Sequence, residues 1–90
     1  MKLRIMTNTK LVVDEAVYSV TLPCLCGELT ALDGHDMLLT ELIEGNVRFR
    51  RSMSEDAFNL QEIKIGMGCA EITKDSVLVF TSSAESVMSK

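Results

Sequence analysis

The chain has 90 residues, a length that makes one compact domain and leaves no room for a separate catalytic lobe. Hydrophobic residues are 47% and charged residues 24%, which is ordinary for a globular domain and argues against an intrinsically disordered chain. The net charge of −4 argues against nucleic-acid binding, although Arg48, Arg50 and Arg51 lie close together. No apolar run approaches the roughly 18 residues of a membrane helix, so we expect a cytosolic location without membrane insertion.

Apolar side chains recur mainly at every second position, with polar residues between them. A period of two over four to eight residues is typical of a half-buried β-strand. In chain order the alternation involves Leu3 and Ile5; Ala16, Tyr18, Val20 and Leu22; Val47 and Phe49; Ile63 and Ile65; and Val77 and Val79. In the last segment Leu78 and Phe80 make the second face apolar as well. We therefore predict an all-β chain of short strands.

Turn-forming residues separate these segments. Asp33-Gly34, Gly45-Asn46 and Lys74-Asp75 are predicted turns, and Arg51 to Asp56 is a predicted hairpin loop with a charged tip. Such spacing is typical of an antiparallel sandwich or barrel. The segment from Asp36 to Glu44 fits a short helix and a strand equally well.

The chain has three cysteines, and an odd number argues against a disulfide framework and for a reducing compartment. Cys24 and Cys26 are too close in sequence for the usual pair of zinc ligands, so we expect one thiol to face inward and the other outward. His35 fits an exposed turn, and a catalytic pair with Cys69 or Cys24 has no local signature. We expect no metal and no cofactor.

Two further patterns have structural explanations. Gly66-x-Gly68 is too little for a phosphate-binding loop, and a bulge or bend with a close backbone contact explains it better. The carboxylates in the middle of the chain fit a solvated face better than a general acid–base pair; they are Glu28, Asp33, Asp36, Glu41 and Glu44. The residue pattern by itself thus indicates a β-rich binding or structural module.

Several short elements, taken in order, resemble the N-terminal domain of the F-type ATP synthase epsilon subunit. They cover about residues 2 to 85 and are Leu3 to Thr7, Ser19 to Pro23, Gly27-Glu28-Leu29, Gly34-His35, Leu38-Leu39-Thr40, Leu42, Gly45, Val47-Arg48, Gly68 to Ile72 and Val77 to Phe80. The chain departs from the family pattern at Asp33, at Asp36-Met37 and at Met67, where the family usually has proline, Ala-Pro and glycine. It also ends before the two C-terminal helices that the family typically has.

The resemblance implies a flattened antiparallel β-sandwich of about ten short strands, with a strand rather than a helix between Asp36 and Glu44. It implies one domain over residues 1–85, and because the last residues of the chain are small and polar we expect residues 86–90 to form a frayed tail. In that family the subunit has no active site. It links the gamma subunit to the c-ring in the central stalk and couples ion flow to ATP synthesis, peripheral to the cytoplasmic face of the inner (plasma) membrane.

The resemblance also implies partner contacts at particular positions. Glu28, Gly34, His35 and Asp36 match positions that face the polar loops of the c-ring, and Thr7 matches a position that contacts gamma. Without the C-terminal helices, these 90 residues are expected not to inhibit ATP hydrolysis by that route. Two alternatives stay open at this point: a free-standing β-sandwich adaptor that binds a partner through a sheet edge, and a thiol enzyme that uses Cys69 with His35.

Overall fold

The computed structural model describes residues 1–53 and 60–87, and these contain ten strands and no helix. In chain order the strands are β1 Lys2–Met6, β2 Leu11–Ala16, β3 Ser19–Cys24, β4 Gly27–Leu32, β5 Leu38–Leu42, β6 Gly45–Arg50, β7 Gln61–Ile65, β8 Gly68–Ile72, β9 Ser76–Thr81 and β10 Ala84–Ser86. The segment that fitted a helix or a strand is therefore a strand, β5, as the resemblance implied.

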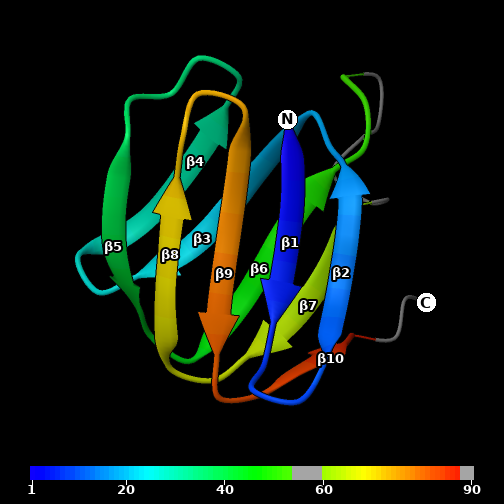
Figure 1. The fold of residues 1–90 in the computed structure, drawn as a ribbon, viewed down its shortest axis with the longest axis vertical. Helices are drawn as coiled ribbons and strands as arrows, with labels where there is room; N and C mark the ends of the chain where they lie inside the picture. The colour runs from blue at the N-terminus through cyan, green and yellow to red at the C-terminus, as the bar shows by residue number, and fades with distance from the viewer. Residues whose placement is uncertain (54–59, 88–90) are drawn as a thin grey trace.

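Hydrogen-bonded pairing runs in the order β10-β7-β6-β3-β5-β8-β9-β1-β2, and β4 pairs with β3. The two halves of this order meet at a single pair, Cys24 opposite Leu42. They pack face to face, with β5, β8, β9, β1 and β2 in the front layer of Figure 1 and β4, β3, β6, β7 and β10 in the back layer. The predicted sandwich of about ten short strands is confirmed. Among the pairings, β1 with β9 is parallel and the others are antiparallel.

The core lies between the layers and is almost entirely aliphatic. Burial alternates along the strands because neighbouring side chains point to opposite faces of a sheet. The inward positions predicted on β1, β6, β7 and β9 are confirmed as buried: Leu3, Ile5, Val47, Phe49, Ile63, Ile65, Val77 and Val79. The predicted run from Ala16 to Leu22 is right only for Val20 and Leu22, which are fully buried.

Ala16 and Tyr18 are exposed because the chain crosses from one layer to the other between them. Val17 is buried at this corner, and its N–H donates to the carbonyl of Met1 at 2.8 Å. The next N–H, of Tyr18, donates to the carbonyl of Arg50 at 2.7 Å. These contacts break the alternation, so β2 ends at Ala16 and β3 begins at Ser19.

The predicted turns at Asp33-Gly34 and Lys74-Asp75 are confirmed, and Gly34 has the positive φ of 90° that glycine adopts without a Cβ clash. The turn predicted at Gly45-Asn46 is wrong by two residues, because Gly45 already begins β6. A Cβ on Gly45 would lie 3.0 Å from Cβ of Pro23, so a close contact with β3 accounts for this glycine.

The loop predicted from Arg51 to Asp56 lies partly outside the described residues, which end at residue 53 on this side and resume at residue 60. Near the C-terminus, Ser86 pairs with Ile63 of β7, and the N–H of Val87 donates to the carbonyl of Glu62 at 3.1 Å. Residues 86 and 87, assigned to the tail from the sequence, are thus paired with β7. Residues 88–90 of the predicted tail lie outside the described part.

Candidate partner-binding surfaces

The outer face of the front layer carries apolar side chains where β8, β9 and β1 lie side by side. Phe80 pairs with Cys69 on one side and with Met6 on the other. The neighbouring row, Ala70 and Val79, is fully buried, so Cys69 and Phe80 point outward. The outer face therefore has an apolar row where alternation would ordinarily place polar residues.

An open hollow of about 400 Å³ lies at the end of this row, and we call it the Thr7 hollow. It is lined by Met6, Thr7, Asn8, Met67, Gly68, Cys69, Phe80, Thr81 and Ser82. Met67 is 71% exposed and Phe80 is 46% exposed. Apolar side chains gathered at the surface mark a site for another molecule more often than scattered ones do.

Hydroxyl groups fix the turns that frame the Thr7 hollow. The Thr7 hydroxyl accepts the N–H groups of Thr9 and Lys10, each at 3.3 Å, and so holds the turn between β1 and β2. The buried hydroxyl of Thr81 lies 3.1 Å from each of the carbonyl oxygens of Gly66, Met67 and Ser83. The walls are therefore ordered before any partner binds, which lowers the entropy cost of docking.

The prediction that Gly66-x-Gly68 marks a close backbone contact is confirmed. A Cβ on Gly68 would collide with the carbonyl oxygen of Phe80 and lie 2.8 Å from Cα of Thr81. A Cβ on Gly66 would collide with the Ser82 hydroxyl. Gly68 thus allows β8 to approach β9 closely beside the hollow, and Gly66 allows the turn before β8 to approach the segment after β9.

Glu28 lies at the beginning of β4, where it is paired within the chain. Its Oε2 accepts a hydrogen bond from Nη2 of Arg48 at 2.7 Å, across the intervening β3. The side chains are 60% exposed for Glu28 and 34% exposed for Arg48. A charge-assisted bond from Glu28 to a basic partner loop would therefore share or replace the Arg48 bond.

Gly34, His35 and Asp36 form the loop between β4 and β5. The Gly34 N–H donates to the carbonyl of Lys74 at 2.7 Å, which joins this loop to the β8–β9 turn. Nδ1 of the half-buried His35 lies 2.6 Å from the carbonyl oxygen of Asp36. Local hydrogen bonds thus order this loop, while Gly34 and Asp36 remain exposed.

The residues predicted to face one partner lie in two places. Glu28 and the Gly34–Asp36 loop are at opposite ends of β4, and Glu28 to Leu32 alone spans about 13 Å of strand. Thr7 lies where β1 ends, whereas the Gly34–Asp36 loop lies near the beginning of β1 (Figure 1). The structure therefore keeps the loop residues together, separates them from Glu28, and places Thr7 at the opposite end.

Cys24 is buried and Cys26 is exposed, as expected. The reason is not strand alternation, which would put both thiols on one face: β3 ends at Cys24, and Cys26 lies in the turn before β4. Cys69 is exposed on β8, and the structure separates it from His35, which lies beside the turn after β8. Within residues 1–53 and 60–87, no three His, Cys, Asp or Glu side chains are placed to hold a metal ion. The same residues contain no helix that would cross a membrane.

Sequence reasoning did not identify the Thr7 hollow, although two of its features are visible in the sequence. The segment around Val77 and Val79 is apolar on both faces, which leaves Phe80 facing outward. Met67 stands where a glycine was expected from the resemblance. An outward apolar residue on a strand is the signal that would have found this surface.

The fold and these surfaces define an all-β sandwich domain with an exposed apolar hollow on one outer face. The family described as "ATP synthase, Delta/Epsilon chain, beta-sandwich domain" matches residues 1–87. The chain therefore belongs to the ATP synthase delta/epsilon-chain β-sandwich family, and the resemblance seen in the sequence is confirmed.

Relatives and solved structures agree with this assignment. The chain is 34% identical over 84 residues to the ATP synthase epsilon chain of Hydrogenobaculum sp., covering 93% of this chain and 57% of that one. It is 37% identical over 82 residues to that of Nostoc sp., covering 91% and 58%. The chain thus spans less than two thirds of these relatives.

The fold is also found in assembled enzymes. A chain in the mitochondrial ATP synthase of Euglena gracilis matches with a TM-score of 0.81 at 20% identity, covering 93% of this chain and 51% of that one. A chain in the central stalk and c-ring structure of the Tetrahymena thermophila enzyme matches with a TM-score of 0.72 at 10% identity, covering 93% and 64%. At these identities the likeness concerns the fold.

Proposed function

We propose that this sandwich is the stalk-binding domain of a non-catalytic epsilon subunit of an F-type ATP synthase. It links the gamma subunit to the polar loops of the c-ring, so that rotation driven by ion flow reaches the catalytic head. The exposed apolar Thr7 hollow on a family-matched sandwich carries the proposal. A close-packed sandwich deforms little, which suits a part that transmits torque.

Gamma docks at the Thr7 hollow in this proposal. Burial of the exposed Met67 and Phe80 side chains supplies the apolar contact, and the ordered turn at Thr7 gives it a fixed rim. The c-ring loops contact Glu28 or the loop of Gly34, His35 and Asp36. Glu28 and this loop lie at opposite ends of β4. Both can contact the c-ring at once only if the contact surface extends along the whole length of that strand.

Cysteine cross-linking in the assembled rotor tests this arrangement. The background replaces the exposed thiols with Cys26→Ser and Cys69→Ser and keeps the buried Cys24. Thr7→Cys is expected to cross-link to gamma, and Glu28→Cys or His35→Cys to the c-ring polar loop. Leu39→Cys, 76% exposed on the front layer, serves as the unlinked reference. No cross-link to the ring from either position would sink the assignment of the ring-facing side.

Residues 1–90, tested as a separate polypeptide, are expected to leave ATP hydrolysis uninhibited. The proposed contacts anchor the domain to gamma and the ring and do not reach a catalytic site. The measurement is the ATPase rate of enzyme depleted of its epsilon subunit, with and without the polypeptide. Strong inhibition would contradict this expectation.

A further inference from the structure

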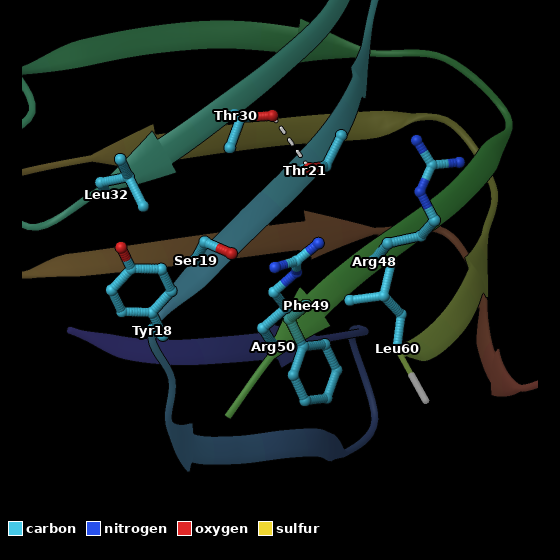
Figure 2. A pocket seen from close by; sticks show the side chains of 9 residues that line it. All are labelled: Tyr18, Ser19, Thr21, Thr30, Leu32, Arg48, Phe49, Arg50 and Leu60. Atoms are coloured by element: carbon cyan, nitrogen blue, oxygen red, sulfur yellow. Dashed lines mark hydrogen bonds between the residues drawn. The ribbon is translucent and has the colours of Figure 1, made fainter. Parts of the chain in front are cut away.

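A second groove lies on the outer face of the back layer, and it differs in chemistry from the Thr7 hollow. Figure 2 shows its lining side chains: Tyr18, Ser19, Thr21, Thr30, Leu32, Arg48, Phe49, Arg50 and Leu60. The register places Ser19 opposite Arg50 and Thr21 opposite Arg48 on one side of β3. On the other side Thr30 pairs with Thr21, and their hydroxyls lie 2.9 Å apart. The groove has a volume of about 320 Å³.

Arg50 differs from the other arginines of the chain in its electrostatic surroundings. Arg4 pairs with Asp14 at 3.4 Å, Arg48 with Glu28 at 2.7 Å and Arg51 with Glu15 at 2.6 Å. Arg50 has no carboxylate within ion-pair distance in residues 1–53 and 60–87, and it is half-buried in the groove. A half-buried guanidinium with no carboxylate partner among the described residues is available to pair with a carboxylate of another molecule.

The charge of the groove limits what binds there. Arg48 and Arg50 contribute two positive charges, and Glu28, bonded to Arg48, cancels one of them. Among the described residues the groove thus has one net positive charge, which matches one carboxylate, whereas a dianionic phosphate would leave one negative charge unbalanced beside Glu28. Tyr18 and Leu32, which are 39% and 45% exposed, add an apolar wall that a bare inorganic anion would leave uncovered.

We infer that this groove docks a segment of a partner protein that carries one acidic side chain, with its carboxylate on Arg50 and an adjacent apolar side chain against Tyr18 and Leu32. Arginine and tyrosine are the residue types that most often dominate binding energy at protein interfaces. The guanidinium donates two parallel hydrogen bonds to a carboxylate, and the hydroxyl of Ser19, which lies opposite Arg50, adds a further donor. The domain would then bind partners through both of its outer faces.

The test uses the gamma subunit assembled with the c-ring of the same enzyme as the binding partner. This choice rests on the proposed function. Affinity of the chain for this rotor is measured at low salt for wild type, Arg50→Gln and Lys64→Gln. Lys64 is exposed on β7 of the same layer and outside the groove, so its substitution makes the same change in net charge. Arg50→Gln is expected to weaken binding about 10-fold or more, with Lys64→Gln near wild type. Circular dichroism checks that both variants fold.

Each outcome is distinct. Equal affinity of Arg50→Gln and wild type would overturn the inference and leave the proposed function standing. Failure of the wild-type chain to bind the rotor would overturn both. Amide NMR shifts around Arg50 in the free chain with inorganic phosphate below 1 mM, absent in Arg50→Gln, would overturn the acidic segment in favour of a small anion.

Discussion

Gly68 has no side chain, and this allows β8 and β9 to approach each other closely beside the Thr7 hollow. A Cβ there would collide with the Phe80 carbonyl oxygen and lie 2.8 Å from Cα of Thr81, and backbone atoms cannot move aside as a flexible side chain does. We expect Gly68→Ala to lower the free energy of unfolding by about 1–3 kcal/mol. Urea denaturation measures it, with the exposed neighbour Cys69→Ala expected to stay within about 0.5 kcal/mol of wild type. Equal stability of the two variants would show that the β9 backbone shifts to accommodate the added methyl group.

Glu15 joins the front layer to the chain just beyond β6. The hydrogen bond and charge of the Arg51 guanidinium lower the pKa of Glu15, with Arg51 Nε only 2.6 Å from Oε1. A lowered pKa stabilises the fold above the ordinary glutamate range, and this contribution is lost as the pH falls through the folded-state pKa. Because the pair is partly exposed, Glu15→Gln should cost less than about 1 kcal/mol at pH 7.

The pH dependence distinguishes this ion pair from simple packing. The stability difference between wild type and Glu15→Gln is expected to shrink between neutral pH and acid, as measured by urea denaturation at several pH values. Glu85→Gln, on the exposed part of β10, is the control. A difference that stays constant down to pH 3 would contradict the ion-pair explanation.

At the scale of elements, the β3–β4 hairpin allows a buried leucine to be compared with an exposed one. Leu22 is fully buried in the core, whereas Leu32 on the paired strand is 45% exposed. Leu22→Ala should cost about 2–5 kcal/mol because it leaves a cavity that the layers cannot close. Leu32→Ala should cost less than about 1 kcal/mol. Thermal or urea unfolding measures the two losses of stability. Similar losses for the two variants would mean that Leu22 does not lie in a close-packed core between the layers.

Alternation of apolar residues predicts a strand well where the strand continues, and it fails where the chain changes layer. Leu3 and Ile5 obey it because β1 is held between β2 and β9 along its length, so every second side chain points into the core between the layers. Ala16 and Tyr18 break it, since the corner at Val17 depends on hydrogen bonds to residues distant in sequence. Such long-range contacts, like the β1–β9 pairing itself, have no local signal.

At the scale of the whole molecule, the family resemblance supplied Thr7, Glu28 and the Gly34–Asp36 loop as candidate contacts, and those roles stay predictions. Their arrangement could not be read from the sequence. It depends on β4 separating Glu28 from the loop, and on β1, β8 and β9 converging beside Thr7. The groove around Arg50 was equally hidden, because it joins β6 to the β3–β4 hairpin, which lies well before β6 in the chain.

Two methionines test which end of the domain binds gamma. Met67 is 71% exposed in the Thr7 hollow, and Met37 is 76% exposed in the loop at the opposite end. Met67→Asp places a charge against the proposed apolar contact and should weaken gamma binding about 10-fold or more. Met37→Asp makes the same change away from it and should leave binding near wild type. Isothermal titration calorimetry gives both affinities for gamma. If Met37→Asp weakened binding and Met67→Asp did not, gamma would bind at the end of the domain that carries Met37.

The most direct measurement is size-exclusion chromatography of the chain mixed with the gamma subunit of the same enzyme. The proposed function predicts a stable 1:1 complex that elutes ahead of either protein alone. Separate elution, with both proteins shown to be folded, would contradict it. The chain would then be a family-matched sandwich with another partner, and a free-standing adaptor that binds through a sheet edge would become the leading explanation.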